Sequence, residues 1–190
     1  MEVMKQQRIR DHRGPARKTE NMTTKNISTT SGIRGLPSDL TVMLGERGLL
    51  NLVLDAVQKV DPACFESEMQ SRPGYRPQML LTLLTYCYTA RIYGSRDIEW
   101  AARYDRTVRY ICAHNFPDWQ MLRRFRRQHR QLLEQTLSGV FRQAWSIQFG
   151  HTDAGMIGYD WSESDLNREL AGTVAQRLDV AALMDGVESD

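Results

Sequence analysis

The chain has 190 residues, 41% of them hydrophobic, so it is long enough to bury a core and suits one domain with loose ends. Its net charge of +2 hides two opposite regions: residues 1–34 hold eight Lys and Arg against three acidic residues, and the segment from Gln143 onward holds nine acidic residues against two Arg. Three cysteines in apolar surroundings, Cys64, Cys87 and Cys112, and the lack of a long apolar run predict a cytoplasmic protein with reduced, buried thiols that is neither secreted nor membrane-spanning.

Residues 1–35 are rich in Ser, Thr, Asn, Gly and basic side chains and show almost no apolar periodicity. Because burial cannot offset the entropy of ordering such a segment, we expect a flexible basic arm. Its residues Arg13, Arg17 and Lys18 suit an extended path in a DNA minor groove, although most tails of this composition only aid solubility.

The first helices are expected after this arm. Ser38 or Asp39 can cap a helix whose apolar residues recur at helical spacing between positions 49 and 57. Pro77 then opens a second helix that is apolar on nearly every side, which predicts a central, buried helix ending at Gly94.

Two shorter helices and one long helix are predicted after the central helix. A helix starting at Ser95 and a further helical piece at positions 107–113 are expected first. After the break at Asn115-Phe116-Pro117, Asp118 is predicted to cap the longest helix, which would run without interruption to about Trp145.

The start of this long helix holds five arginines within eight positions, with no carboxylate between them. They are Arg123, Arg124, Arg126, Arg127 and Arg130. The helical period places Arg123, Arg127 and Arg130 on one flank, with Arg126 near the apolar edge, where we expect a structural role. Because a guanidinium can bond a phosphate or a guanine edge with two hydrogen bonds, this flank predicts contact with DNA, and Gln120 lies near the end where base contacts are usual. A merely solvated charged face is the alternative, but such a face would usually intersperse Glu.

After a Gly-rich joint at residues 150–158, an acidic helix is expected from about Ser162. Its apolar residues stack at i, i+4 spacing: the four larger ones are Leu166, Leu170, Val174 and Leu178, and Ala182 follows them. Its carboxylates do not follow the calcium-loop pattern, and no His or Cys falls at zinc spacing, so neither a metal nor another cofactor is expected. No Ser or Cys nucleophile has a motif around it, so no catalytic residue is expected.

No segment alternates apolar and polar residues as a strand would, so the predicted class is all-α. We expect a helical bundle that contains a helix-turn-helix-like DNA-binding unit with a long C-terminal recognition helix. The predicted domains are residues 1–35 as the arm, 36–147 as the DNA-binding domain, and 148–190 as the joint and acidic tail.

Four motifs occur in a characteristic order: Tyr75-Arg76-Pro77-Gln78-Met79-Leu80-Leu81, Gly94-Ser95-Arg96-Asp97-Ile98-Glu99, Pro117-Asp118, and Arg124-Phe125-Arg126-Arg127-Gln128-His129-Arg130. From about Leu36 to Trp145 the chain resembles the N-terminal helical domain of bacterial insertion-sequence transposases of the insertion-sequence-five superfamily. The resemblance implies recognition of terminal inverted repeats in double-stranded DNA, which adds Arg96 to the expected DNA contacts. A second copy of the chain or a full-length transposase is a further expected partner.

In that family a following RNase H-like domain holds an Asp-Asp-Glu triad and two divalent metals. Asp153 and Asp160 do not match the first catalytic Asp, so the resemblance implies a DNA-binding protein in transposition that is not an enzyme by itself. The chain also has Trp119-Gln120-Met121 where the family usually has Ser-Thr after Pro117-Asp118, so its DNA specificity is expected to differ.

Three alternatives stay open. The chain can be one part of a split transposase whose catalytic half is a separate protein. It can be a helical interaction module in which the four stacked apolar residues of the acidic helix form a short seam for a partner helix. The acidic tail can also fold back on residues 123–130 and mask them from DNA.

Overall fold

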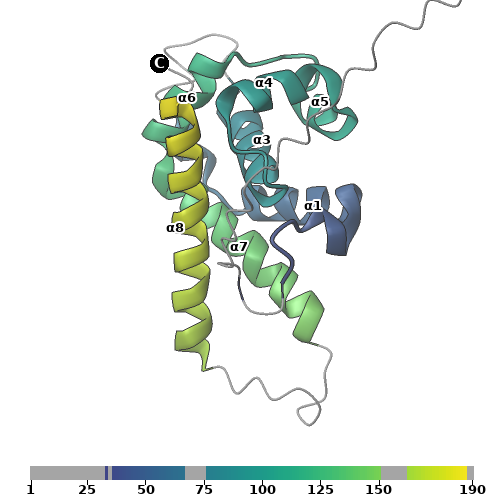
Figure 1. Cartoon of the computed structure of the whole chain (residues 1–190), viewed down its shortest axis with the longest axis vertical. Helices are drawn as coiled ribbons and strands as arrows, with labels where there is room; N and C mark the ends of the chain where they lie inside the picture. The colour runs from purple at the N-terminus through teal and green to yellow at the C-terminus, as the bar shows by residue number, and fades with distance from the viewer. Residues whose placement is uncertain (1–32, 34–35, 67–75, 151–161, 188–190) are drawn as a thin grey trace, which may run out of the picture. The chain divides into compact units, whose positions relative to one another are not determined.

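The computed structural model describes residues 33, 36–66, 76–150 and 162–187 (Figure 1). The chain divides into two units, Met1–Thr30 and Ser31–Asp190, and every described residue belongs to the second. All regular structure among the described residues is helical, which confirms the all-α class. The predicted contacts of the arm, at Arg13, Arg17 and Lys18, lie outside the described residues.

The first helix, α1 (Thr41–Gln58), has Leu40 at its N-cap position and not Ser38 or Asp39, but Asp39 still satisfies the first N–H group of the helix. The Asp39 carboxylate accepts hydrogen bonds from the Thr41 backbone N–H at 2.8 Å and from the Thr41 hydroxyl at 2.6 Å. A short 3-10 helix, η1 (Pro62–Phe65), follows. Its residue Cys64 is exposed, so the prediction that all three thiols are buried is wrong at this position: a single 3-10 turn on the surface buries only one of its faces, which here carries Phe65.

The predicted central helix is α3 (Pro77–Thr89), with Pro77 in its first turn. Every residue from Leu80 to Thr89 is buried, which confirms its central position (Figure 1). The helix ends at Thr89 and not at Gly94, because Arg91 adopts a left-handed conformation with a φ of 64°. Gly94 instead immediately precedes the next helix.

Two short helices, α4 (Ser95–Tyr104) and α5 (Arg106–Cys112), lie against each other. Asp105 separates them, and its carboxylate accepts a hydrogen bond from the Val108 backbone N–H at 2.8 Å, which caps α5. Gly94, at the N-cap position of α4, has no side chain that could cap the helix. The first N–H groups of α4 have no acceptor within the helix and need one from elsewhere in the chain.

The predicted long helix is in fact two helices, α6 (Trp119–Gln128) and α7 (Arg130–Phe149). The predicted cap is confirmed, since the Asp118 carboxylate accepts from the Met121 backbone N–H at 2.7 Å. The prediction of an uninterrupted helix is wrong: His129, with φ −115° and ψ 31°, separates the two. The centroid of its ring lies 4.4 Å from that of the Phe125 ring and 5.4 Å from that of the Phe65 ring. Tertiary packing therefore interrupts the helix, although the helical spacing of apolar residues continues in the sequence.

The acidic helix is α8 (Glu163–Val187), which packs against α7, α3 and α4 (Figure 1). Ala182 is exposed, but the four larger stacked apolar residues of α8 are all buried among the chain's own core residues: Leu166, Leu170, Val174 and Leu178. They are therefore not available as a seam for a separate partner helix, which removes the basis of that alternative.

Candidate nucleic-acid interface

The outward face of α6 carries four of the residues predicted to contact DNA. Gln120, Arg124 and Arg127 are exposed, and Arg123 is partly exposed. Their spacing of three, four and seven positions puts them on one side of the helix. The helix contains no acidic residue, and among the described residues neither Arg124 nor Arg127 forms an ion pair. This face is therefore cationic and open to solvent.

The N-terminal end of α6 is fixed against α4. The Trp119 backbone N–H donates a hydrogen bond to the Glu99 carboxylate at 3.2 Å. The Trp119 ring also lies next to two guanidinium groups. Its centroid is 4.5 Å from the Cζ atom of Arg123 and 5.2 Å from the Cζ atom of Arg96. Arg96 is exposed at the start of α4, so the structure brings this predicted contact residue to the same end of the interface as Gln120.

Arg126 points away from this face into the protein. It is only 7% exposed, donates to the Ala181 carbonyl at 3.0 Å and to the Tyr88 hydroxyl at 3.4 Å, and pairs with Asp185. Burial lowers the pKa of its guanidinium, but Tyr88 and Asp185 outweigh burial and raise it, so Arg126 stays charged. The predicted structural role of Arg126 is confirmed.

Two other residues of the arginine flank predicted to contact DNA, Arg123 and Arg130, form ion pairs with carboxylates of α8. Arg123 pairs with Asp185, whose carboxylate lies 3.2 Å from the Arg123 Nε. Arg130 belongs to α7 and bonds the carboxylates of Glu134 at 3.0 Å and Asp179 at 2.9 Å. Hydrogen bonding to Asp179 is the main cause that raises the pKa of Arg130. Arg130 thus belongs to the helix after the break at His129, but it still lines one open cleft with Arg123 and Arg127, and α8 supplies carboxylates to both sides of the break.

Asp185 is the residue that sequence reasoning missed. It is 5% exposed and accepts hydrogen bonds from the Ser95 backbone N–H at 2.9 Å and from the Ser95 hydroxyl at 2.8 Å. It therefore caps α4, because its carboxylate faces the positive end of that helix. A run of acidic residues at the end of the sequence gave no sign of which one would be buried.

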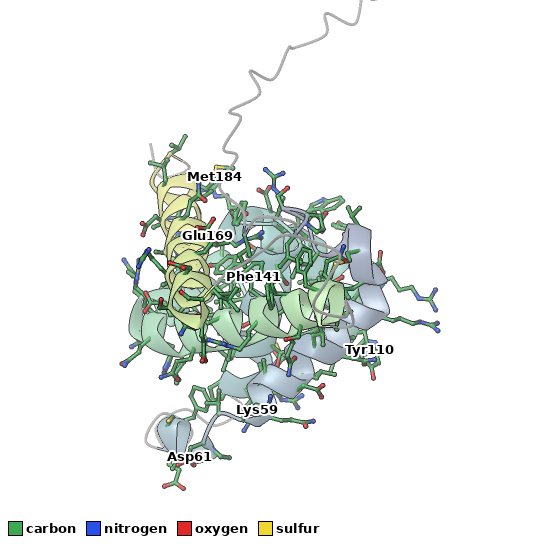
Figure 2. All side chains as sticks on the ribbon, turned by 90° about the horizontal axis from the view of Figure 1, so that it is seen from below. Lys59, Asp61, Tyr110, Phe141, Glu169 and Met184 are labelled. Carbon is green, nitrogen blue, oxygen red and sulfur yellow. The ribbon has the colours of Figure 1, made fainter. Side chains whose placement is uncertain are left out.

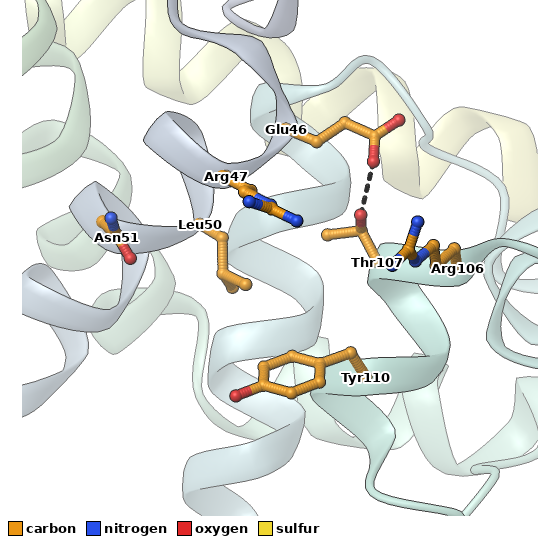
Figure 3. A pocket seen from close by; sticks show the side chains of 7 residues that line it. All are labelled: Glu46, Arg47, Leu50, Asn51, Arg106, Thr107 and Tyr110. Atoms are coloured by element: carbon orange, nitrogen blue, oxygen red, sulfur yellow. Dashed lines mark hydrogen bonds between the residues drawn. The ribbon is translucent and has the colours of Figure 1, made fainter.

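A second cationic surface lies between α1 and α5, at an open cleft of about 420 Å³ (Figure 3). Figure 3 shows the Arg47 side chain on α1 and the side chains of Arg106 and Tyr110 on α5 around this space. The only carboxylate in its lining, that of Glu46, accepts a hydrogen bond from the Thr107 hydroxyl at 2.5 Å. Sequence reasoning did not identify this surface, because its basic residues are far apart in the chain.

No group of three or more His, Cys, Asp and Glu among the described residues could hold a metal ion. None of the described helices is both long and apolar enough to cross a lipid bilayer.

Residues 48–128 match the model of a family described as Transposase domain (DUF772). The matched region starts within α1 and ends at the last residue of α6, so it includes the arginine-rich face but neither α7 nor α8. The match supports a transposase-related family and a function connected with transposition. Neither the curated proteins nor the solved structures give a significant match to the chain.

Proposed function

We propose that this transposase-related chain binds double-stranded DNA through the outward face of α6 and so recognises the end sequences of a mobile element. The observation that carries the proposal is the pair of exposed arginines, Arg124 and Arg127, on a helix without any carboxylate. Planar guanidinium groups suit both the phosphates and the guanine edges of the major groove.

In this proposal α4 and α6 form a helix-turn-helix-like unit. The packing of α4 against α6 and the bond from the Trp119 N–H to Glu99 support it, because they fix the angle of α6 to its neighbour. Gln120 lies in the first turn of α6, where reading helices usually contact base edges, and Arg96 flanks that turn from α4. Arg13, Arg17 and Lys18 would add contacts in the adjacent minor groove.

The proposal assigns binding and no chemistry to the described residues. Strand transfer needs carboxylates that hold two metal ions, and the described part of the chain offers no cluster of that kind. The catalytic step would therefore depend on carboxylates from outside these residues, including those of a full-length transposase.

A binding titration tests the proposal. The probes are a duplex carrying the sequence that flanks the gene and a random duplex of equal length, each measured between low and moderate salt. The logarithm of the association constant should fall steeply with the logarithm of the salt concentration, and replacing both Arg124 and Arg127 by Ala should reduce the slope by about 2.

The matched control replaces Arg142 and Arg168 by Ala, since both are exposed, lie on α7 and α8, and remove the same charge. This control should bind nearly as the wild type does. Equal losses in the two double variants, or binding that does not respond to salt, would overturn the proposal. A loss confined to replacement of Arg47 and Arg106 would place binding at the α1–α5 cleft and would also overturn it.

A further inference from the structure

The carboxylate of Asp185 sits in a cluster of donors that suits an oxyanion. The cluster consists of the Ser95 N–H, the Ser95 hydroxyl, and the guanidinium groups of Arg123 and Arg126. The Ser95 hydroxyl and the Arg126 guanidinium donate to one Asp185 oxygen, Oδ2, and the Nε of Arg123 lies 3.2 Å from the same oxygen as an ion pair. A DNA backbone phosphate, like a carboxylate, carries its negative charge on two oxygens, and these accept the same charge-assisted hydrogen bonds from guanidinium, hydroxyl and backbone N–H donors.

The cluster also has the electrostatics of a phosphate site. The N-terminal end of α4 carries a partial positive charge, and two full positive charges from α6 face it. Arg126 is buried, so its charge is screened less by solvent than that of a surface arginine. An open cleft of about 420 Å³, lined by Arg123, Arg127, Arg130 and Gly186 among others, connects the cluster to solvent.

The last turn of α8 is attached through Asp185, whose carboxylate meets the cluster and whose backbone carbonyl accepts a hydrogen bond from the Arg123 guanidinium. Around Asp185, the side chains of Leu183, Met184 and Val187 are 68%, 44% and 70% exposed, so little apolar surface holds this turn. The apolar residues that anchor α8 in the core end at Ala181. Helix ends open locally at low free-energy cost, so Asp185 can leave the cluster while the body of α8 stays packed.

We propose that Ser95, Arg123 and Arg126 form a phosphate-binding site, that Asp185 occupies it in this state as an internal carboxylate, and that a DNA backbone phosphate displaces Asp185 when DNA binds α6. The last part rests on the proposed function. α8 then acts as a displaceable cover of the arginine-rich helix. Deleting the whole segment from Gly150 does not test this, because it also removes the buried residues of α8 from the core.

The first experiment uses inorganic phosphate and the full chain with Asp185→Ala. The variant leaves the guanidinium of Arg126 without its carboxylate, so phosphate should raise its melting temperature more than chloride at equal ionic strength. The matched control is Asp165→Ala, which removes the same charge from α8 but only surface contacts, the pair with Arg168 at 3.2 Å and a hydrogen bond from the Ser162 hydroxyl at 2.6 Å. Wild type and this control should show no phosphate-specific rise. If Asp185→Ala shows none either, or if all three chains show the same rise, the proposal is overturned.

The second experiment compares duplex DNA affinity at fixed salt. Asp185→Ala should bind about tenfold more tightly than Asp165→Ala, because the DNA no longer competes with an internal anion. Equal affinities of the two variants would overturn the displacement step. If no chain binds DNA while phosphate still stabilises Asp185→Ala, the proposed function fails and the phosphate site stands.

A third measurement needs no variant and covers the case in which Asp185→Ala does not fold. Hydrogen exchange is followed on the wild-type chain with and without duplex DNA. The amides of residues 182–187 should exchange faster in the complex, since the last turn of α8 is released, while those of residues 166–181 should not. Unchanged or slower exchange at residues 182–187 overturns the proposal.

Discussion

The guanidinium group of Arg177, in α8, donates a hydrogen bond to the backbone carbonyl of Tyr88 near the C-terminal end of α3. It also reaches the carbonyls of Thr89 and Ser38, and it lies over the ring of Phe141 at 4.6 Å. Figure 2 shows Phe141 in the interior beside α8. The last carbonyls of a helix lack partners within it and carry partial negative charge, so a cation from α8 satisfies them. Through Arg177 and Asp185, one helix thus binds the negative end of α3 and the positive end of α4.

Removing this anchor should destabilise the fold. We expect Arg177→Ala to lower the free energy of unfolding by about 2–3 kcal/mol, because buried carbonyls lose their donor. Arg168→Ala is the control on the same helix: its side chain is 80% exposed and its pair with Asp165 lies at the surface, so about 0.5 kcal/mol or less should be lost. Urea denaturation measures both, and equal losses would contradict the anchoring role.

Two glycines should respond to alanine in opposite directions. Gly45 interrupts α1 with φ 67° and ψ 166°, a conformation that is costly for any L side chain, although nothing lies within 4 Å of an added Cβ. Gly45→Ala should therefore lower the free energy of unfolding by about 1–3 kcal/mol. Gly172 lies within α8, also with open space around it, and Gly172→Ala should raise stability by about 0.5–1 kcal/mol. Thermal melts of the two variants give the signs, and a stabilised Gly45→Ala would show that the break in α1 is not needed.

The three thiols should differ in reactivity. Cys64 is exposed, whereas Cys87 and Cys112 are buried, and burial raises the pKa of both buried thiols, that of Cys112 to about 11. Because the thiolate is the reactive form, a brief treatment of the native chain with iodoacetamide at pH 8 should modify Cys64 alone. Mass spectrometry of the digested product locates the label, and all three should react in urea. Labelling of Cys87 without denaturant would mean that α3 is not buried.

Stability should fall at high pH. Burial raises the pKa of Tyr88 from 10.0 to about 12 and that of Cys112 from 9.0 to about 11, so both groups hold their protons longer in the folded chain than in the unfolded one. Their contribution is complete below pH 9 and is lost as pH rises through 9 to 12, by up to about 1.4 kcal/mol per pH unit for each group. Urea titrations at pH 8 to 11 measure the decline, and Cys112→Ala should make it shallower. A flat profile would contradict the burial of both groups.

Much of the local structure follows from the sequence. Pro77 and Asp118 mark helix starts, the apolar run of α3 marks the central helix, and the arginines of α6 with no carboxylate mark a cationic helix. The helical period alone places Arg126 near the edge of the apolar face, a position that favours a structural role. These features depend on hydrogen bonds and side-chain spacing within a few residues, which the sequence contains in full.

Only the tertiary structure decided where the cationic helix ends and which carboxylates pair with its arginines. His129 ends α6 because its ring packs against Phe65, far from it in the chain, and so Arg130 begins a second helix, where it pairs with Asp179 of α8. Asp185 caps α4 and pairs with two arginines of α6 from ninety positions beyond Ser95. Such contacts depend on the path of α8 across α3 and α7, a path set by burial of its apolar side and by no local signal among its many carboxylates.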